Sequence, residues 1–432
     1  MTEVVEIDGK PHVMDPEEGS LEIKYGLPGD VKFCKSCVIS NQRPSSAVEF
    51  KHTADSKKTT IGFNEDGVCD ACAYNASKKD DIDWEERERQ LIELCDRYRS
   101  RNGSYDCLVP GSGGKDSVFQ SHILKSKYGM HPLTVTWAPH LYTDVGWRNF
   151  QNWLHIGGFD NYLFTPDGQT HRKLTQLAFR NLLHPFQPFI LGQKNFAPKM
   201  AAKFGIPLVF YGENEAEYGN ALSENESASR KAEYFARLSR SNEELYLGGV
   251  AVSDLPDHGI KTGQLDPYLP ASVDDLREAD IDVQYLGYYL KWVPQENYYY
   301  AVEHCGFEAN EDRTEGTYSK YNSIDDRIDD FHYLTTYVKF GIGRATYDAA
   351  QEIRSGDITR EEGVALVKRF DGEFPERFVE EIFEYLSLPE DQYPEAAKMF
   401  EQPIMTRAYF DELTDRFRSP HLWAKVDGEW RL

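Results

Sequence analysis

The segment Pro110-Gly111-Ser112-Gly113-Gly114-Lys115-Asp116-Ser117 has the residue types and spacing needed to bind and activate a phosphate group. It follows a short apolar run, Tyr105–Val109, and opens a stretch of helical character that ends near Tyr128. A glycine-rich turn between a strand and a helix exposes several backbone N–H groups, and the helix dipole adds partial positive charge there. The segment therefore predicts a loop that binds an anion.

The residue after the lysine indicates which kind of phosphate loop this is. A Walker A loop needs Ser or Thr directly after its Lys to hold Mg²⁺, whereas this chain has Asp116. The loop resembles the SGG-x-DS signature of the ATP pyrophosphatase (PP-loop) superfamily, whose members cleave ATP to AMP and pyrophosphate and leave AMP on a substrate oxygen. An ordinary glycine-rich turn between a strand and a helix is the alternative interpretation.

Each residue of the loop has an expected role. The N–H groups of Ser112 to Lys115 and the hydroxyl of Ser117 suit a departing pyrophosphate, and Lys115 adds positive charge where negative charge develops. Asp116 is expected to hold Mg²⁺, which typically joins one or two carboxylates to phosphate oxygens. The expected nucleotide-binding residues of the loop are Gly111, Ser112, Gly113, Gly114, Lys115, Asp116 and Ser117.

Two cysteine pairs, Cys34-Lys35-Ser36-Cys37 and Cys69-Asp70-Ala71-Cys72, predict a metal site. A two-residue spacer lets both thiolates of a pair face one ion, and two pairs complete a tetrahedral four-cysteine zinc site. Because protein fills all four positions, we expect structural zinc; free buried thiols or a redox pair are the alternatives. Cys95, Cys107 and Cys305 are isolated and are expected to be small buried apolar residues.

Composition limits the function classes. The chain has 432 residues, 40% of them hydrophobic, and a net charge of −24. The length allows two or three domains, and the charge argues against a wide surface for nucleic acid or anionic membrane. No apolar run reaches the ~20 residues of a membrane helix, and the first residues lack the features of a signal peptide. We therefore expect a cytoplasmic protein with no nucleic-acid or membrane partner.

Apolar runs and helical stretches alternate from residue 105 to about 250, which predicts a doubly wound parallel α/β sheet. The expected strands are Tyr105–Val109, Leu133–Trp137, Tyr162–Phe164 and Pro207–Tyr211. The expected helices are Lys115–Tyr128, Val145–Ile156, His171–Leu183 and Asn195–Phe204, preceded by a charged amphipathic helix that starts near Ile82. Residues 250–325 are rich in Pro, Gly, Asp and Tyr and are expected to be irregular with short helices.

The expected organisation is an N-terminal arm (1–28), a zinc-ribbon module (29–80), a PP-loop domain (81–325) and a helical C-terminal region (326–432). Ligands of doubly wound sheets bind beyond the carboxyl ends of the strands. The glycine-rich loop follows the first strand and Gly212–Gly219 follows the fourth, so both are expected at one rim. Glu213 and Glu217 are the candidate catalytic carboxylates there, besides Lys115 and Asp116.

Two further cations are candidates from the C-terminal region. Lys339 and Arg344 flank Gly341 and Gly343, which permit close approach of the backbone to a ligand, so this pair is expected to close over phosphates or a sugar nucleotide. A pair of surface basic residues is the alternative. Thr359, followed by acidic residues, is an expected helix N-cap.

Several segments together resemble the N-acetyl sugar amidotransferase family of bacterial surface-polysaccharide and flagellin-glycan synthesis, which makes acetamidino sugars such as derivatives of pseudaminic and legionaminic acid. The resemblance covers about residues 30 to 385. The matching segments are the two cysteine pairs, Gly111–Ser117, Pro185–Phe189, Gly192–Asn195, Gly212–Gly219, Glu315–Tyr318 and Lys339–Thr346. The long insert between the cysteine pairs departs from the pattern.

The resemblance implies an ATP-dependent, AMP-forming amidotransferase for lipopolysaccharide and related glycan biosynthesis. Its substrate would be an acetamido sugar or sugar nucleotide. The chain has no evident Cys/His glutaminase signature, and activated cysteine is what glutamine hydrolysis requires. The resemblance therefore implies a separate glutaminase subunit that delivers ammonia.

Three other functions fit part of the pattern. A PP-loop tRNA-thiolating enzyme also joins a zinc ribbon to such a domain, but generally needs reactive cysteines and a basic face. An ammonia-dependent ligase of the asparagine, GMP or NAD synthetase type lacks the zinc module. A non-catalytic assembly subunit is disfavoured by the intact Gly113–Ser117 segment.

Overall fold

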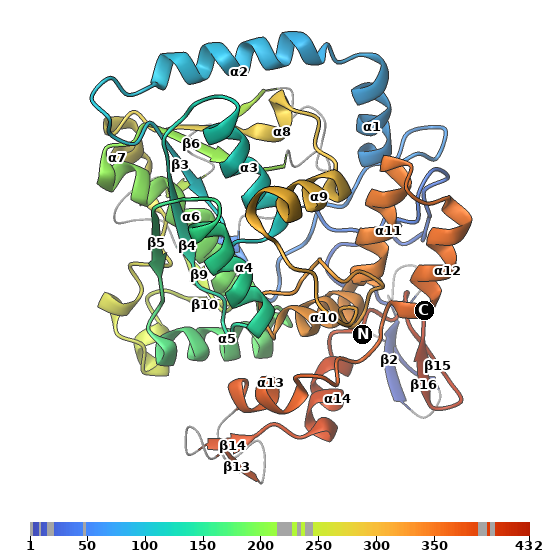
Figure 1. The fold of residues 1–432 in the computed structure, drawn as a ribbon. Helices are drawn as coiled ribbons and strands as arrows, with labels where there is room; N and C mark the ends of the chain where they lie inside the picture. The colour runs from blue at the N-terminus through green and yellow to red at the C-terminus, as the bar shows by residue number, and fades with distance from the viewer. Residues whose placement is uncertain are drawn as a thin grey trace.

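The computed structural model describes residues 3–7, 10–14, 21–45, 49–213, 227–230, 235–237, 245–387, 395–397 and 402–432. Its centre is a six-stranded sheet in the order β5-β4-β3-β6-β12-β7 (Figure 1). The strands are β3 (Cys107–Pro110), β4 (Pro132–Trp137), β5 (Asn161–Phe164), β6 (Leu208–Tyr211), β7 (Ser229–Arg230) and β12 (Asp282–Tyr285). The first five of that order are mutually parallel, and β7 pairs antiparallel with β12.

The strand order reverses beside β3. The chain proceeds from β3 to β4 and β5 on one side, then crosses to β6 and β12 on the other, with Leu108 opposite Val209 in the register. At such a reversal the loops after the two adjacent strands diverge and leave a crevice at their carboxyl ends. The crevice here lies between the glycine-rich loop after β3 and Gly212-Glu213 after β6.

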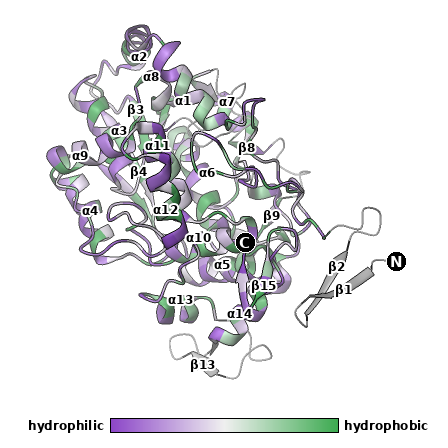
Figure 2. Ribbon diagram, turned by 90° about the vertical axis from the view of Figure 1, so that its right-hand side faces the viewer, coloured by the Kyte–Doolittle hydropathy of each residue, from purple (hydrophilic) through white to green (hydrophobic). Residues whose placement is uncertain are grey.

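Helices cover both faces of the sheet. Those of the α/β region are α2 (Trp84–Tyr98), α3 (Lys115–Ser126), α4 (Asp144–His155), α5 (Gly168–Leu182), α6 (Gln187–Phe204), α7 (Val273–Glu278), α8 (Leu286–Tyr289) and α9 (Pro294–Cys305). Leu108 and Val209 pack with α5, α6 and α7, whereas Val109 and Phe210 pack with α2, α3 and α8. Because successive strand residues point to opposite faces, each strand contributes to both cores. Figure 2 shows the outer helix α2 mostly hydrophilic.

The doubly wound parallel sheet predicted from the sequence is confirmed, with two strands added, the parallel β12 and the antiparallel β7. Strand β12 lies within the stretch expected to be irregular, because its sequence, Asp282-Val283-Gln284-Tyr285, is short and polar at alternate positions. Its buried Gln284 is satisfied by hydrogen bonds with Tyr289 and Asp282, at 2.7 Å each. Helix α6 begins at Gln187, before the expected Asn195, with Pro188 in its first turn.

The C-terminal region is mainly helical, as expected. Its helices are α10 (Asp329–Phe340), α11 (Arg344–Ser355), α12 (Arg360–Phe370), α13 (Val379–Tyr385) and α14 (Arg407–Asp415). The expected cap at Thr359 is confirmed: its hydroxyl accepts from the backbone N–H of Glu362, whose carboxylate accepts from the Thr359 N–H.

The two cysteine pairs pack on these C-terminal helices (Figure 1), whereas Phe50, which lies between the pairs in the sequence, packs in the core of the α/β region. Its helix α1 (Asp70–Asp80) starts at the second cysteine pair. The four cysteines, Ile39 and Ile61 share one apolar cluster with Ile342, Ala349 and Ala350. Arg360 donates from Nε to the Cys37 carbonyl at 3.0 Å and from a terminal nitrogen to the Cys34 carbonyl at 3.1 Å. Segments about 300 residues apart in the sequence therefore form one unit.

The remaining strands are short, and 3-10 helices lie at Glu49–Lys51, Leu255–His258 and Thr262–Gln264. These strands are β1 (Glu3–Ile7), β2 (Lys10–Met14), β8 (Ala236–Arg237), β9 (Tyr246–Leu247), β10 (Val250–Ala251), β11 (Ala271–Ser272), β13 (Glu395–Ala397), β14 (Gln402–Ile404), β15 (Ala424–Val426) and β16 (Glu429–Arg431). In the described part of the chain, no helix combines the length and apolar character needed to cross a membrane.

Helix α6 reaches the sheet only because Gly192 has no side chain. A Cβ at this position would lie 2.2 Å from Cε2 of Trp137, a residue of β4 that is 3% exposed. We expect Gly192→Ala to lower the free energy of unfolding by about 1–3 kcal/mol through overpacking, measured by denaturant titration. Gly168→Ala is the matched control, because nothing lies within 4 Å of its Cβ position. Equal stability of the two variants would contradict the packing argument.

Candidate active site

Three cavities lie along the carboxyl side of the sheet. The acidic cavity, of about 380 Å³, lies between the glycine-rich loop and the C-terminal region. The crevice cavity, of about 440 Å³, lies on the other side of the loop, at the ends of β3, β4 and β6. The basic cavity, of about 110 Å³, adjoins the acidic cavity at Trp292, Pro294 and Gln351. The acidic and crevice cavities share Ser112, Gly114, Asp116 and Glu213.

The glycines of the loop are required by close packing. Gly113 has φ +84°, and a Cβ there would lie 2.6 Å from Cα of Phe150 in α4. A Cβ on Gly111 would lie 2.3 Å from Cβ of Ser117. Gly114 is the N-cap of α3 and gives it no side-chain cap. The first N–H groups of α3 therefore face the loop without a capping side chain, as a phosphate site needs.

Lys115 and Asp116 form an ion pair beside the loop. The Lys115 Nζ donates to Asp116 Oδ2 at 2.5 Å, and the Asn297 amide donates to Asp116 Oδ1 at 3.1 Å. The Lys115 side chain is 10% exposed, whereas that of Asp116 is 34% exposed. Ser117 turns back to the loop, because its hydroxyl donates to the Gly114 carbonyl at 2.8 Å. The loop thus presents one cation and one carboxylate to the same space.

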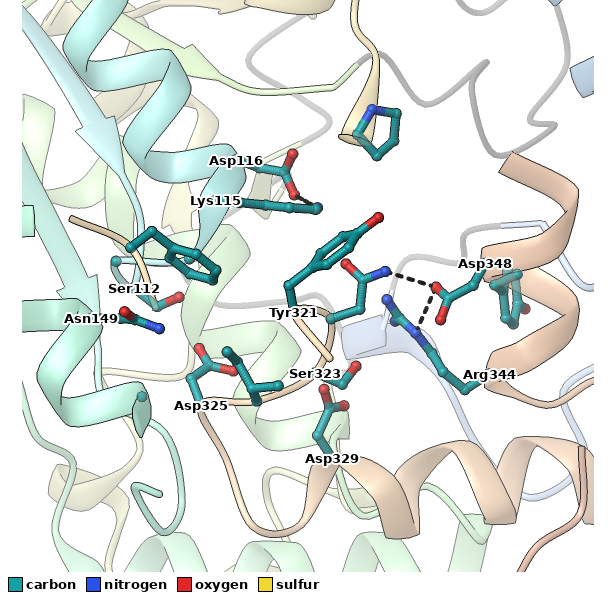
Figure 3. Close-up of a pocket in the computed structure, with 18 of the residues that line it drawn as sticks. Ser112, Lys115, Asp116, Asn149, Tyr321, Ser323, Asp325, Asp329, Arg344 and Asp348 are labelled. Atoms are coloured by element: carbon teal, nitrogen blue, oxygen red, sulfur yellow. Dashed lines mark hydrogen bonds and ion pairs between the residues drawn. The ribbon is translucent and has the colours of Figure 1, made fainter. Parts of the chain in front are cut away.

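Carboxylates from the C-terminal region form the opposite wall of the acidic cavity (Figure 3). Asp325 and Asp329 lie below the loop, and Asp348 lies across from it on α11. Burial raises the pKa of Asp325, partly offset by a hydrogen bond from Ser112. Burial raises the pKa of Asp329 to about 7, although the Arg344 guanidinium acts in the opposite direction. This cavity therefore contains a carboxyl group that titrates near neutral pH.

Arg344 is the cation of this wall. Its Nε lies 3.0 Å from Asp348 Oδ1, and its terminal nitrogen donates to the hydroxyl of Tyr333. Asp348 also accepts from the Thr317 hydroxyl at 2.6 Å and from the Asn322 amide at 3.1 Å. The ion pair with Arg344 and the hydrogen bond from Asn322 thus meet at the same Asp348 oxygen, and Figure 3 shows Arg344 directed toward Asp348. Arg344 is thus held in one place by a fully bonded carboxylate.

Asp371 fixes the start of α11, where Arg344 is the first residue. Its carboxylate accepts from the N–H groups of Gly343 and Thr346, at 3.1 Å each. A Cβ on Gly343 would lie 2.6 Å from Asp371 Oδ1, so glycine is needed for this approach. Burial raises the pKa of Asp371 to about 6, against the effect of these hydrogen bonds.

The segment that carries Asp325 is anchored from behind by a buried pair. Asp326 accepts from the His140 N–H at 2.8 Å, from His140 Nδ1 at 2.7 Å and from the Ile328 N–H at 3.0 Å. On the other side, a Cβ on Gly146 would lie 2.5 Å from Cα of Asp325. Asp325 is therefore confined between the N-terminus of α4 and the loop.

The residues predicted from the sequence separate into three groups. Ser112, Gly113, Gly114, Lys115, Asp116, Glu213 and Arg344 line the acidic cavity, and Gly111 and Ser117 line the crevice cavity. Glu217 lies outside the described residues. The structure does not bring Lys339 to the site: it is 4% exposed, and its Nζ donates to the Leu182 carbonyl at 2.7 Å. Lys339 belongs instead to the packing between α5 and α10.

Sequence reasoning missed the acidic wall. Asp325, Asp329 and Asp348 come from the region expected to be irregular or merely helical. The run Ser323-Ile324-Asp325-Asp326-Arg327-Ile328-Asp329-Asp330 contained a signal, because two Asp pairs beside apolar residues are unusual for a solvated turn.

The four-cysteine cluster fits a metal ion. The ligand atoms of Cys34, Cys37, Cys69 and Cys72 all lie within 4.8 Å of one another, and all four residues are buried. The Cys37 and Cys69 sulfurs are 3.8 Å apart, as on an edge of a tetrahedron with Zn–S bonds of about 2.3 Å. N–H groups of Ser36, Cys37 and Cys69 donate to the Cys34 sulfur at 3.3–3.4 Å, which favours a thiolate there. The zinc ligands predicted from spacing thus come together.

The remaining cysteines are buried, as expected. Cys95, Cys107 and Cys305 are at most 1% exposed. None of the three lines a cavity described above. Burial raises the pKa of Cys95 to about 12 and that of Cys305 to about 11, so neither supplies a thiolate at neutral pH.

Comparison with known proteins identifies the C-terminal part of the chain. Residues 315–432 match the family of the C-terminal domain of WbpG-like LPS biosynthesis proteins. The match begins just before the segment that forms the acidic wall. An uncharacterized protein of Methanocaldococcus jannaschii, MJ1599, is 31% identical over 84 residues, which are 19% of this chain and 29% of that protein. The chain thus spans less than a third of the length of this curated relative.

Three solved structures are similar at low levels. An NH3-dependent NAD synthetase from Campylobacter jejuni, in complex with nitrate, has 12% identity and a TM-score of 0.25, covering 33% of this chain and 59% of its own. An NMN synthetase from Francisella tularensis has 12% identity and a TM-score of 0.24, and the match covers 46% of this chain and 85% of the synthetase. The U34-tRNA thiolase NcsA from Methanococcus maripaludis, with its [4Fe-4S] cluster, has 10% identity and a TM-score of 0.28. The match covers 78% of this chain and 89% of the thiolase.

The four-cysteine cluster predicts that the protein binds zinc. We expect the purified protein to contain about one zinc ion per chain, and Cys72→Ser to lose it with a fall in stability of several kcal/mol, because the metal links two parts of the chain. Elemental analysis and thermal unfolding measure both effects. Cys305→Ser is the control and should keep its metal. Iron with the absorption spectrum of an iron–sulfur cluster would contradict the zinc assignment.

Asp329 generates a pH prediction. Its folded pKa of about 7 lies above the ordinary 3.8, so between these values the folded protein binds more protons than the unfolded chain. Stability is therefore lost as the pH rises from about 4 to about 7. Asp329→Asn is expected to weaken this dependence and to be more stable than the parent at about pH 8 by up to a few kcal/mol. Urea unfolding across this range measures it.

The exposed Asp312 lies outside the acidic cavity, so Asp312→Asn serves as the matched control. It should leave the pH dependence of stability unchanged. A parallel loss of stability with pH in Asp329→Asn and the parent would show that Asp329 is not the titrating group.

Proposed function

We propose that the chain is an ATP-dependent, AMP-forming amidotransferase that converts the acetamido group of an N-acetyl sugar or sugar nucleotide to an acetamidino group. Ammonia comes from a separate glutaminase subunit, and the product serves bacterial surface-glycan biosynthesis. One observation carries the proposal: the glycine-rich loop and residues 321–351 line the same cavity. The latter segment lies within the stretch similar to LPS biosynthesis proteins.

The reaction replaces an amide oxygen by nitrogen. Oxygen is a poor leaving group from an amide, so ATP first supplies an adenylyl group. The acetamido oxygen forms a bond to the α-phosphorus of ATP, and the bond from that phosphorus to pyrophosphate breaks. Ammonia then attacks the activated carbon, and the carbon–oxygen bond breaks. The original amide oxygen departs on the phosphate of AMP. Positioning of both reactants and stabilisation of the developing charges are the tasks left to the protein.

The loop residues suit the phosphate part of this reaction. The N–H groups at the start of α3 and the Lys115 ammonium face the same space, where they would stabilise a departing pyrophosphate. Asp116 is the half-buried carboxylate beside them, more exposed than Lys115, and would hold Mg²⁺. Its present partners, Lys115 of α3 and Asn297 of α9, hold that carboxylate at the start of α3.

The two cavities beside the loop suit different molecules. The crevice cavity has apolar walls from Val135, Trp137 and Phe196, as a planar base requires. The acidic cavity is lined by carboxylates, hydroxyls and amides, which suit the hydroxyl groups of a sugar. Glu213 lines both cavities and is in a position to contact both reactants.

Asp329 is our candidate for the group that accepts the ammonia proton. A carboxylate with a pKa of about 7 is matched to proton transfer at neutral pH. It lines the same cavity as the loop and Arg344. Its role is distinct from that of Asp116, whose carboxylate is part of the phosphate site.

A tRNA-thiolating activity is the alternative. It generally requires accessible cysteines in the catalytic domain. In the described part of this chain, the cysteines outside the four-cysteine cluster are buried and line none of the three cavities. The net charge of −24 also disfavours a large RNA.

The deciding experiment traces the amide oxygen. The protein, Mg-ATP and ammonium are incubated with a panel of acetamido sugars and sugar nucleotides labelled with oxygen-18 in the acetamido group. Ammonium replaces the glutaminase, and mass spectrometry follows the products. Labelled AMP together with a sugar carrying NH in place of oxygen would support the proposal. Unlabelled AMP with unaltered sugars would contradict it and redirect the test to tRNA.

Asp116→Ala supplies a second test of the same proposal. Loss of the carboxylate that would hold Mg²⁺ is expected to reduce AMP formation by about a hundredfold or more. Asp312→Ala, at an exposed aspartate outside the cavities, is the control and should retain the parent rate. Equal rates in both variants would remove Asp116 from the mechanism.

A further inference from the structure

The basic cavity is an extension of the acidic cavity toward the cysteine-rich module. It is bounded by α1, by residues 291–294, by the first turn of α9 and by the end of α11. Trp292, Pro294 and Gln351 line both cavities. A molecule that fills the acidic cavity and is longer than that cavity therefore reaches the basic one at this junction.

The charge reverses from one cavity to the other. Lys78, Lys79, Lys291 and Arg354 line the basic cavity, together with two acidic residues, Glu296 and Asp357. Basic residues thus outnumber acidic ones here, in a chain whose net charge is −24. The acidic cavity beside it contains the carboxylates of Asp325, Asp329 and Asp348. A ligand that spans both is accordingly neutral or hydroxylated at one end and anionic at the other.

The walls of the basic cavity are held together by hydrogen bonds between separate elements. Lys78 is buried, and its Nζ donates to the Trp292 carbonyl at 3.2 Å. The Asn75 amide donates to the Arg354 carbonyl at 2.9 Å, which joins α1 to α11. Trp292 is itself fixed by an edge-to-face contact with Phe119 of α3, with ring centroids 5.3 Å apart. The cavity is therefore preformed rather than a gap between mobile parts.

Two of its lysines extend into solvent at the rim. Lys79 and Lys291 are both exposed, and neither forms an ion pair with any residue that the structure describes. Lys79 belongs to α1 and Lys291 to the segment before α9, so they approach the cavity from different elements. Ammonium groups arranged in this way bind phosphate oxygens.

We propose that the basic cavity binds the phosphate that links the sugar to a carrier, so that the substrate is a phosphate-linked acetamido sugar and not a free one. The inference rests on the proposed function and specifies its substrate class. The sugar lies in the acidic cavity, where hydroxyl, amide and carboxylate groups suit its hydroxyl groups, and the loop beside it holds the phosphates of ATP. The linking phosphate lies between Lys79, Lys291 and Arg354. A nucleotide and a lipid diphosphate offer the same phosphate chemistry to this cavity.

The test measures binding without turnover. The parent protein is first saturated with Mg²⁺ and α,β-methylene ATP, so that the loop is occupied and phosphate probes report on the basic cavity. Calorimetric titrations then use UDP-N-acetylglucosamine, CMP-N-acetylneuraminic acid, farnesyl-diphosphate-linked N-acetylglucosamine and the two free sugars. We expect at least one phosphate-linked probe to bind about tenfold or more tightly than its free sugar.

A charge-matched pair of double variants identifies the site. Lys79→Gln with Lys291→Gln should remove most of the preference for the phosphate-linked probe, a loss of about tenfold or more. Lys173→Gln with Lys368→Gln makes the same change in charge at exposed lysines that do not line the basic cavity, and should keep the preference. Binding of α,β-methylene ATP is expected to be unchanged in both, which excludes misfolding.

The outcomes distinguish a nucleotide carrier from a lipid carrier, and the phosphate site from the proposed reaction. Selective binding of a nucleotide-linked probe that is lost in the first variant supports a nucleotide carrier, and the same result with the farnesyl probe supports a lipid carrier. No preference for any phosphate-linked probe, or equal preference in both double variants, overturns the inference. These binding measurements do not depend on conversion of the sugar. If a phosphate-linked probe binds selectively but the oxygen-18 experiment fails, the proposed reaction is rejected and the assignment of the phosphate site stands.

Discussion

The approach of Asp325 to the glycine-rich loop is the contact on which the acidic cavity depends. Ser112 lies on one side of this residue, and the N-terminus of α4 lies on the other, so close that Gly146 has no room for a side chain. The next residue, Asp326, is held on the side away from the cavity by its buried hydrogen bonds with His140. The C-terminal region therefore completes the site instead of merely covering it, and the loop alone forms only half of the enclosure.

The cysteine module stabilises that completed site from a distance. It shares an apolar cluster with α11, and Arg360 of α12 donates to the backbone carbonyls of two of its cysteines. Helix α11 carries Arg344 and Asp348, which form one wall of the acidic cavity. A metal among the four cysteines would consequently act on the position of these two side chains without contacting any reactant.

The sequence was informative where chemistry depends on contiguous residues. The glycine-rich loop, the cysteine pairs and the alternation of strands and helices each reside in short segments, so their physical roles were predictable. The acidic wall was not, because Asp325 and Asp329 reach the loop only through packing of distant elements. Lys339 shows that closeness in sequence can also mislead. It is five residues from Arg344, which suggested a shared site, but it lies in α10 and donates to a backbone carbonyl of α5, whereas Arg344 begins α11.

The loop is the floor of two cavities that otherwise have different walls. Among the residues that the structure describes, both cavities share Ser112, Gly114, Asp116 and Glu213, while Trp137 and Phe196 belong to one and Arg344 and Asp348 to the other. A molecule in either cavity therefore leaves most of the other cavity's surface accessible. The described residues therefore provide two separate binding surfaces that meet at the loop and Glu213.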